Sequence, residues 1–344
     1  MVTKITKSRA TGRVTLADVA KESQVSSMTA SRALRGERAV DPALVARVRV
    51  AAEMLGYVPD PAARALASRH SSHVAILIPM LSNTLFVDVL EAVQQTLQGA
   101  GFQTLMGVTH YDPDEEEQLL REQLQHRPAG LIVTGFERNE ATRQLIAKSG
   151  VPCVHLMEVL KSNGSDGIYS VGFSHEEGGA AMTKHLMGQG KRRIAFAAAQ
   201  LDPRTLQRLE GWRQTLKAAG MYDPVLECLD PAPSSIAQGG KMFEHIFKQQ
   251  PDVDAIFYCN DDLAQGGLLA ALRLGISVPK QVAIAGFNDL NGSDQMLPPL
   301  STVRTPRSEI GTTSANMLLA LIKGQTVPVP NIDLGFELIT REST

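Results

Sequence analysis

Hydroxyl and guanidinium side chains cluster in a short polar stretch near the N-terminus. Ser26, Thr29, Ser31 and Arg32 lie within seven residues. Such groups donate hydrogen bonds to phosphate oxygens, and an arginine can also bind a base edge. Residues 1–70 carry twelve Lys and Arg but only six Asp and Glu, whereas the whole chain has a formal charge of −2. This basic head is predicted to bind a polyanion, with a solvated basic tail as the alternative.

Catalytic and metal-binding patterns are absent from the sequence. It contains no Gly-x-Ser-x-Gly, Walker-type loop or His-Glu-x-x-His. Cys153, Cys228 and Cys259 lack metal-like spacing, and the acids of residues 112–117 suit the start of a helix. His155 lies in an apolar run, which is typical of a packed residue. We therefore expect no enzyme, no cofactor and no metal site.

The composition predicts a soluble protein of the cytoplasm. Hydrophobic residues make up 43% of 344 residues, which suffices for packed cores in two or three domains. No run approaches the roughly 18 apolar residues of a membrane helix, and the N-terminus lacks the apolar stretch of a secretory signal. No membrane association is expected.

Three short helices are predicted in the basic head. The expected helices and their caps are Leu16–Ser23 after Thr15, Ser27–Leu34 after Ser26, and a third that starts at Pro42 after Asp41 and stops at Gly56. Because only three residues separate the first two, they form a helix-turn-helix.

The rest of the chain predicts an α/β body with parallel sheets. The expected strands are Val74–Ile78, Thr104–Val108, Leu131–Thr134, Cys153–Leu156, Ile194–Ala198, Ala255–Tyr258 and Val282–Ala285. Helical patterns lie between most of them, which is typical of parallel sheets covered on both faces. Some 270 residues exceed one usual core, so we expect two lobes with a ligand cleft beyond the carboxyl ends of the strands.

The predicted domains follow from this organisation. They are a basic arm at 1–13, a helix-turn-helix domain at 14–58, a hinge at 59–72 and a two-lobed body at 73–344, with lobe 1 at about 74–172 and 303–324 and lobe 2 at about 173–302 and 325–344.

The head closely resembles the DNA-binding domain of the lactose-repressor (LacI) family. The matching segments are Val14–Ala20, Val25–Arg32 and Gly56–Pro59. In such a head the second helix enters the major groove by its N-terminal end, which places Ser27 and Met28 at base edges. The resemblance assigns mostly phosphate contacts to the remaining polar residues, namely Thr15, Ser26, Thr29, Ser31 and Arg32. A protein-binding three-helix module is the alternative.

The hinge resembles the segment that inserts a leucine into the minor groove in this family. Ala63–Ala67 match it, with Leu66 at the position of the wedge. The alternative for Leu66 is burial against the lobes.

The body resembles the same family over nearly its whole length, most of all its gluconate-operon repressors. The similar segments are Ile78–Phe86, Val171–Phe173, Leu201–Thr205, Cys259–Ala264 and Ala285–Phe287. The resemblance implies a fold like that of periplasmic binding proteins. It also implies ligand contacts from Leu85, Phe86, Phe173, Arg204 or Arg208, Asn260 and Asn288.

These side-chain types favour an acidic ligand. A guanidinium in a partly dry cleft holds a carboxylate by two parallel hydrogen bonds. Asn288 stands where several sugar- or purine-binding relatives have an aspartate, which removes a charge that would repel an anion. Asn260 and Asp261 could bond hydroxyls, although Asp261 is left undecided. Gluconate, 6-phosphogluconate and ketogluconate all fit.

Alternatives remain for two of these positions. Arg208 could instead form a salt bridge between the lobes. Asp262 is expected to cap the following helix rather than to contact ligand.

The sequence therefore predicts a homodimeric repressor that binds double-stranded operator DNA and is released by a sugar acid. A corepressor response, or a neutral-sugar or purine effector, is the alternative within the family. A solute-binding protein or a sugar-acid enzyme using Asp261 or His155 is the alternative outside it. Because no leucine heptad ends the chain, we expect no assembly beyond the dimer.

Overall fold

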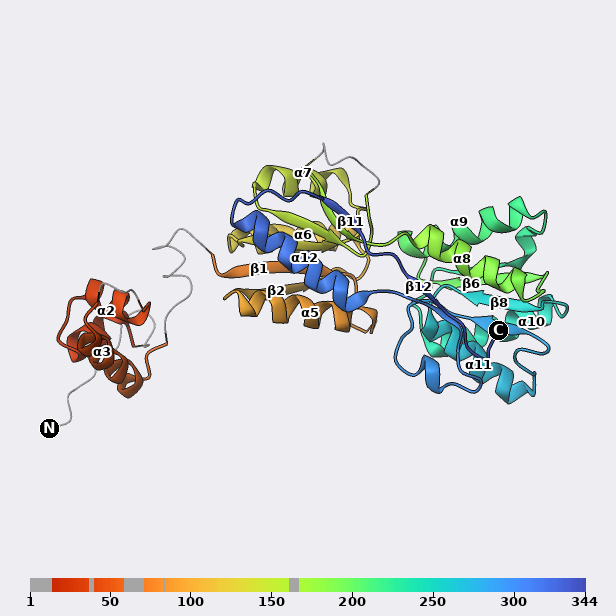
Figure 1. Cartoon of the computed structure of the whole chain (residues 1–344), viewed down its shortest axis with the longest axis horizontal. Coiled ribbons are helices and arrows are strands. Elements are labelled where there is room, and N and C mark those ends of the chain that lie inside the picture. The colour runs from red at the N-terminus through yellow and green to blue at the C-terminus, as the bar shows by residue number, and fades with distance from the viewer. Residues whose placement is uncertain (1–13, 37–39, 59–70, 83, 161–166) are drawn as a thin grey trace. The chain divides into compact units, whose positions relative to one another are not determined.

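The computed structural model describes residues 14–36, 40–58, 71–82, 84–160 and 167–344. The chain divides into two compact units, Met1–Ser71 and Ser72–Thr344. We call them the head and the body (Figure 1).

The head is three helices around one small core. They are α1 (Leu16–Glu22), α2 (Ser27–Leu34) and α3 (Pro42–Leu55). Each pair of helices is in contact. The buried side chains are Val19, Ala20, Ala30, Ala33, Val48, Ala51 and Ala52. Small residues dominate this core, so the helices pack closely although each is short.

The predicted helix boundaries of the head are nearly those observed. Thr15, Ser26 and Asp41 each accept a backbone hydrogen bond as N-cap, and Gly56 ends α3 in the left-handed conformation. The first helix ends at Glu22, one residue earlier than expected. Local capping chemistry therefore sets these boundaries.

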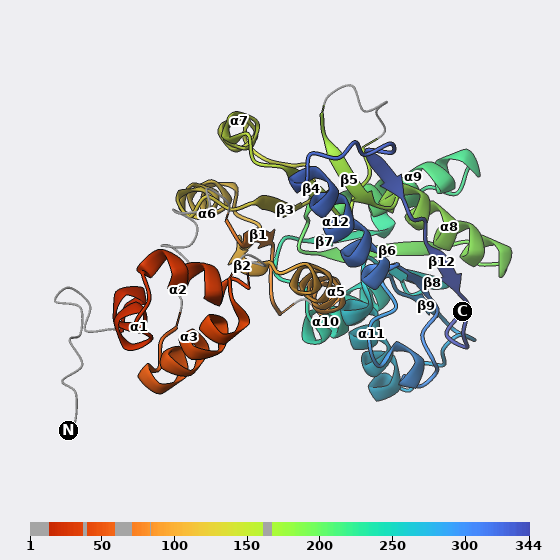
Figure 2. The same cartoon turned by 60° about the vertical axis from the view of Figure 1, so that its left-hand side comes forward.

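Lobe 1 of the body is a six-stranded parallel sheet covered on both faces. Its strands are β1 (His73–Ile78), β2 (Gln103–Val108), β3 (Gly130–Thr134), β4 (Cys153–Leu156), β5 (Tyr169–Gly172) and β11 (Asn331–Asp333), in the order β11-β5-β4-β3-β1-β2. Its helices are α5 (Leu85–Gly99), α6 (Pro113–Gln125), α7 (Glu140–Ser149) and α12 (Arg307–Ile322). Helices α5 and α12 pack side by side on one face (Figures 1 and 2), and α6 packs with α7 on the other.

Lobe 2 is a four-stranded parallel sheet between two helix pairs. Its strands are β6 (Ile194–Ala199), β7 (Glu227–Asp230), β8 (Ala255–Tyr258) and β9 (Ala283–Ala285), in the order β7-β6-β8-β9. The helices are α8 (His175–Gly188), α9 (Pro203–Ala218), α10 (Ile236–Gln249) and α11 (Asp261–Leu274). Helix α8 packs on α9, and α10 packs on α11.

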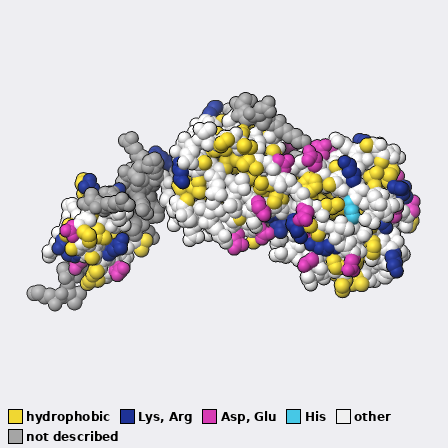
Figure 3. Space-filling model, viewed as in Figure 1, with side chains coloured by type: hydrophobic (Ala, Val, Ile, Leu, Met, Phe, Trp, Pro, Cys, Tyr) yellow, Lys and Arg dark blue, Asp and Glu magenta, His cyan; other side chains and the backbone are white. Residues whose placement is uncertain are grey.

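The chain crosses between the lobes after β5 and on both sides of α12. A two-stranded antiparallel sheet of β10 (Thr302–Arg304) and β12 (Glu337–Ile339) forms part of the crossing. Figure 3 shows acidic and basic side chains close together where the lobes join. Arg304 forms ion pairs there with Asp289 and Glu337. The crossings and their ion pairs join the two sheets.

The sequence prediction for lobe 2 is wrong at one point. It assigned residues 325–344, approximately, to lobe 2, but Asn331–Asp333 pair in parallel with β5 of lobe 1. The three-residue strand has no apolar run, so its partner depends on where α12 returns the chain. Strands β5, β7, β10 and β12 were also not predicted, and each has only three or four residues.

Candidate functional site

The N-terminal end of α2 is an exposed surface of the head. Ser26 caps the helix: its Oγ accepts a hydrogen bond from the backbone N–H of Thr29 at 3.1 Å. Ser26, Ser27 and Met28 are exposed, and Met28 as a whole residue is 65% exposed. A large apolar side chain this exposed at a helix start is available to contact a partner.

The other head residues differ in how available they are. Arg32 is exposed on α2, whereas Thr29 and Ser31 are half-buried. Thr15 lies in a capping box, where its Oγ1 donates to Asp18 Oδ2 at 2.7 Å and its backbone N–H donates to the same oxygen. These hydrogen bonds from Thr15 lower the pKa of Asp18. Leu66 lies outside the described residues.

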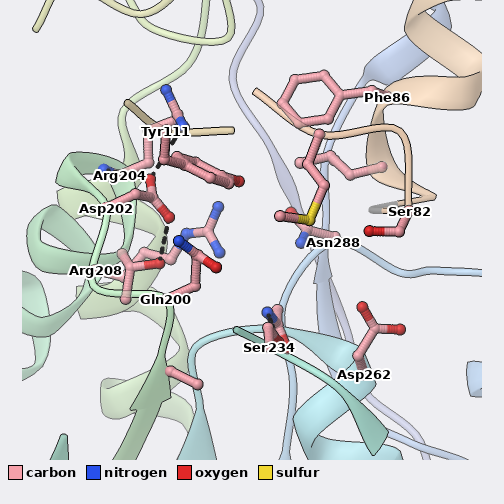
Figure 4. A pocket seen from close by; sticks show the side chains of 15 residues that line it. Ser82, Phe86, Tyr111, Gln200, Asp202, Arg204, Arg208, Ser234, Asp262 and Asn288 are labelled. Atoms are coloured by element: carbon pink, nitrogen blue, oxygen red, sulfur yellow. Dashed lines mark hydrogen bonds and ion pairs between the residues drawn. The ribbon is translucent and has the colours of Figure 1, made fainter. Parts of the chain in front are cut away.

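A pocket lies between the lobes at the carboxyl ends of their strands. Its empty volume, which opens to solvent, is about 570 Å³. Its lining residues are Met80, Ser82, Leu85, Phe86, Tyr111, Ala199, Gln200, Asp202, Arg204, Thr205, Arg208, Ser234, Asn260, Asp262 and Asn288 (Figure 4). Parallel α/β sheets place ligand sites at this edge.

The two lobes contribute different chemistry to the pocket. Lobe 1 provides mainly apolar or aromatic side chains, among them Leu85 and Phe86 from the first turn of α5 and Tyr111 after β2. Lobe 2 provides all the charged side chains of the lining. A ligand between the lobes would therefore pack on lobe 1 and hydrogen-bond mainly to lobe 2.

Arg208 is a buried arginine without an acidic partner. Its residue is 4% exposed, and no ion pair to its guanidinium is found within the described ranges. The Nε–H donates to His175 Nδ1 at 3.2 Å, and Nη1 donates to the Cys259 carbonyl at 2.5 Å. The guanidinium carbon lies 4.0 Å from the ring centroid of Phe287. Burial lowers the pKa of Arg208, which means that its charge is poorly solvated.

Arg204, one turn earlier on α9, already has carboxylate partners. Its guanidinium lies 3.1 Å from Asp202 and 4.0 Å from Glu158, which follows β4 in lobe 1. Burial would lower its pKa, but the negative charges around it outweigh burial and raise the pKa. Gln207 of the same helix donates to Glu158 at 2.6 Å. The salt bridge between the lobes, predicted as an alternative for Arg208, is therefore made by Arg204.

The start of α11 corrects the prediction made for Asp262. Asn260, not Asp262, is the N-cap: its Oδ1 accepts from Leu263 N at 3.1 Å. Its Nδ2 donates to Ser234 Oγ at 2.7 Å, and both residues line the pocket. Asp262 lines the pocket in the first turn, where burial raises its pKa.

Asp261, undecided from the sequence, belongs to the core of lobe 2. Its carboxylate is fully buried and accepts hydrogen bonds from the Leu290 backbone N–H and the hydroxyls of Ser293 and Thr302. Burial raises its pKa to about 6. It joins three segments and does not line the pocket.

Asn288 lines the pocket with an unpartnered acceptor. It is 2% exposed, and its Oδ1 has no hydrogen-bond partner among the residues that the structure describes. The backbone carbonyl of Asn288 accepts a hydrogen bond from the guanidinium of Arg307, which also pairs with Asp88 on α5. Burying an acceptor without a hydrogen bond costs free energy, so a hydrogen-bond donor on a ligand would offset that cost at Asn288.

Phe173 does not line the pocket, contrary to the sequence prediction. It is 1% exposed and packs on His175 and Phe287, with ring centroids 4.3 and 6.3 Å away. It lies at the crossing after β5, in contact with Phe287, whose ring lies beneath the guanidinium of Arg208. Its contact with the site is therefore indirect.

The sequence did not predict several of the residues that line the pocket, among them Tyr111, Gln200, Asp202 and Ser234. Each follows a strand, so its place at a carboxyl end was the available signal. Ser234 follows β7, whose short Glu-Cys-Leu-Asp segment does not look like a buried strand.

His155 and Cys153, the candidates for enzyme or metal chemistry, are packed against neighbouring side chains. Burial lowers the pKa of His155 to about 4, and its ring stacks on Phe136 at 4.7 Å. Burial also raises the pKa of Cys153 to about 12. Among the described residues, no His, Cys, Asp and Glu group suits a metal ion, and no helix is long and apolar enough to span a bilayer.

Comparisons with family models match both units. Residues 15–60 match the model for bacterial regulatory proteins of the lacI family. Residues 183–344 match the model for a periplasmic binding protein-like domain.

Two curated relatives match nearly the full chain. The HTH-type transcriptional regulator GntR of Pseudomonas aeruginosa is 52% identical over 336 residues, covering 98% of this chain and 97% of the relative. GntR of Escherichia coli K12 is 35% identical over 328 residues, covering 95% and 97%. Both are described as transcriptional regulators.

Two solved structures share the fold. The transcription regulator GntR from Chromobacterium violaceum is 46% identical with a TM-score of 0.76, and the match covers 79% of this chain and 98% of that one. A LacI-family transcriptional regulator from Silicibacter pomeroyi is 36% identical with a TM-score of 0.88, covering 96% and 98%.

Proposed function

Because the chain belongs to the LacI family of bacterial regulators, and so is a DNA-binding transcriptional regulator rather than an enzyme, we propose that it represses genes of sugar-acid metabolism. In this proposal, the heads of a homodimer bind the two halves of a near-palindromic operator. A gluconate-type sugar acid in the cleft releases them. The protein acts in the cytoplasm, where the operator lies.

The observation that carries the ligand assignment is the state of Arg208. A buried guanidinium without a carboxylate partner among the described residues has a desolvation cost that an anionic ligand can offset. The planar fork binds a carboxylate by two parallel hydrogen bonds. Arg204 is less suited to this role, because Asp202 and Glu158 already neutralise it. We assign the carboxylate of the ligand to Arg208.

The rest of the pocket suits a polyhydroxyl chain. Ser234, Asn260, Asp262 and Asn288 offer hydroxyl, amide and carboxylate groups on lobe 2 and at the crossing. Phe86 on lobe 1 offers an apolar surface for the carbon skeleton. The regulator CelR, of the same fold at 28% identity, is known in complex with cellobiose. Gluconate, ketogluconate and 6-phosphogluconate share the carboxylate and hydroxyls, and binding measurements distinguish them.

The head would bind DNA through α2. Ser27 and Met28 reach base edges, while Ser26, Thr29, Ser31 and Arg32 hold phosphates. Thr15 binds DNA only if its capping hydroxyl is shared with a phosphate. Leu66 would enter the minor groove. One head neutralises too few phosphates for tight binding, which is why the proposal needs a two-fold dimer.

Release follows from linkage between the two sites. If the sugar acid favours a state of the dimer whose heads fit the operator poorly, each ligand weakens the other by the same factor. A coupling of about 1 to 3 kcal/mol, or roughly 5- to 150-fold, is typical.

Calorimetry of the full-length protein tests the proposal. We expect gluconate or one of its two relatives to bind, glucose to bind much more weakly, and the affinity to fall when operator duplex is present. Equal affinity with and without operator contradicts the coupling. A higher affinity would identify a corepressor, and preferred binding of glucose would overturn the sugar-acid assignment.

A further inference from the structure

His175 connects the pocket arginine to the crossing between the lobes. It is the first residue of α8 and is fully buried. Its Nε2 lies 2.9 Å from the carbonyl oxygen of Met157, and its Nδ1 lies 3.2 Å from Nε of Arg208. Met157 directly follows β4 of lobe 1, and its N–H donates to the Val171 carbonyl. The ring therefore joins a lobe 1 backbone group to a lobe 2 pocket side chain.

Only one form of the imidazole satisfies both contacts. The Met157 carbonyl can only accept, so Nε2 must carry the proton. Arginine Nε–H can only donate, so Nδ1 must keep its lone pair. The ring is thus neutral, with its proton on Nε2. Burial, followed by the charges of Arg208 and Arg204, lowers the pKa of His175 well below 6.5, in agreement with the neutral form.

The surroundings leave Arg208 few other ways to orient. Phe173 packs on one side of His175, and Phe287 lies 6.1 Å from its ring centroid and beneath the Arg208 guanidinium. The Cys259 carbonyl holds a second edge of the guanidinium. Arg208 lines the pocket, whereas His175 does not. An action of His175 on a ligand must therefore pass through the arginine.

We propose that His175 is a positioning residue for effector recognition: the lone pair of its Nδ1 sets the guanidinium of Arg208 in the orientation that receives the ligand carboxylate. This inference rests on the proposed function, in which Arg208 binds that carboxylate. The ring donates its Nε2 proton to Met157, which anchors it to the crossing.

Two substitutions separate the two contacts. Asparagine places an oxygen where Nδ1 stands, so His175→Asn keeps an acceptor for Arg208 and loses the donor to Met157. Glutamine places an amide nitrogen near Nε2, so His175→Gln keeps that donor and loses the acceptor. If His175 had a merely structural role, the loss of ligand affinity in each variant would parallel its loss of stability. Thermal melting of each variant measures that stability.

Calorimetric titration with gluconate, ketogluconate and 6-phosphogluconate measures the effect on binding. For the acid that wild type binds, we expect His175→Asn to stay within about threefold of wild type and His175→Gln to lose about tenfold or more. Equal losses in the two variants, no loss in either, or the reverse order would overturn the proposal.

Nitrogen NMR of the ligand-free wild type gives a second readout that does not depend on effector or on folding of a variant. We expect His175 to be neutral with the proton on Nε2 at pH 7; a proton on Nδ1 would overturn the proposal. If wild type binds none of the three acids, the proposed function fails, whereas the NMR result still tests the Nδ1 contact with Arg208.

Discussion

The head and the cleft each present an arginine that we propose binds an anion, but the two arginines lie in opposite surroundings. Arg32 is exposed on α2, whereas Arg208 on α9 is 4% exposed. An exposed charge is well solvated and screened, so a surface needs many such contacts for affinity. A buried charge is poorly solvated, so one partner with good geometry can contribute much. The same functional group thus suits a polyanion in one unit and a single carboxylate in the other.

The largest expected difference between the two sites is in how strongly salt weakens binding. Between about 50 and 200 mM salt, we expect operator affinity to fall by roughly 10³-fold if the dimer neutralises about six phosphates. Sugar-acid affinity should change by less than about threefold, because buried pairs are screened much less. Fluorescence anisotropy and calorimetry measure the two affinities. Equal salt dependence would remove the distinction between the sites.

Removal of the cleft arginine should abolish one function and spare the other. We expect Arg208→Ala to weaken sugar-acid binding by about 30-fold or more, since truncating one partner of a buried charge pair costs about 2–5 kcal/mol. Operator affinity without effector should stay within about twofold. Arg208→Lys is the matched control: it keeps the charge but lacks the planar fork, so binding should recover only in part. Unchanged binding in Arg208→Ala would place the carboxylate elsewhere.

Removal of the neighbouring arginine should act on stability instead. Arg204→Ala leaves the buried carboxylates of Asp202 and Glu158 without their partner, which should lower the free energy of unfolding by about 3 kcal/mol. Adding Glu158→Gln should restore part of the loss. Arg143→Ala, in an exposed pair with Glu140, should cost at most about 0.5 kcal/mol. Urea unfolding measures all of these variants.

The two arginines have separate roles in this account. If Arg204→Ala reduced sugar-acid affinity as much as Arg208→Ala does, without loss of stability, that separation would be contradicted.

The smallest effects are expected in the head. Arg32→Ala should weaken every duplex by about tenfold and reduce the salt slope by about one, as for a phosphate contact. Substitution of Met28 should instead change which bases are preferred. Arg49→Ala on the exposed surface of α3 is the control and should change affinity by about twofold at most. Unchanged preference across Met28 variants would exclude it as a base-reading residue.

Sequence patterns predicted the elements well wherever the signal was local. Thr15, Ser26 and Asp41 cap helices as expected, and the seven predicted strands are present with bounds that differ by at most one residue. Caps and apolar runs act over a few residues, so they can be read along the chain. Short strands such as β7 and β11 carry little of this signal and were missed.

The pocket was predictable in outline only. Arg204, Arg208, Asn260 and Asn288 all line it, and parallel sheets make that position predictable from strand ends. Phe173 instead packs on His175 and Phe287 and does not line the pocket, because the end of β5 is where the chain crosses between the lobes. No local pattern encodes that burial.

The amino-acid order alone determined the basic head, its capped helices and the alternation of strands and helices, because each depends on residues near one another in the chain. The tertiary structure alone decided that Glu158 neutralises Arg204, that Arg208 meets His175 instead of a carboxylate, and that Asn331–Asp333 join lobe 1. Those outcomes depend on contacts between distant segments. Which charges stay uncompensated is settled only when the lobes come together.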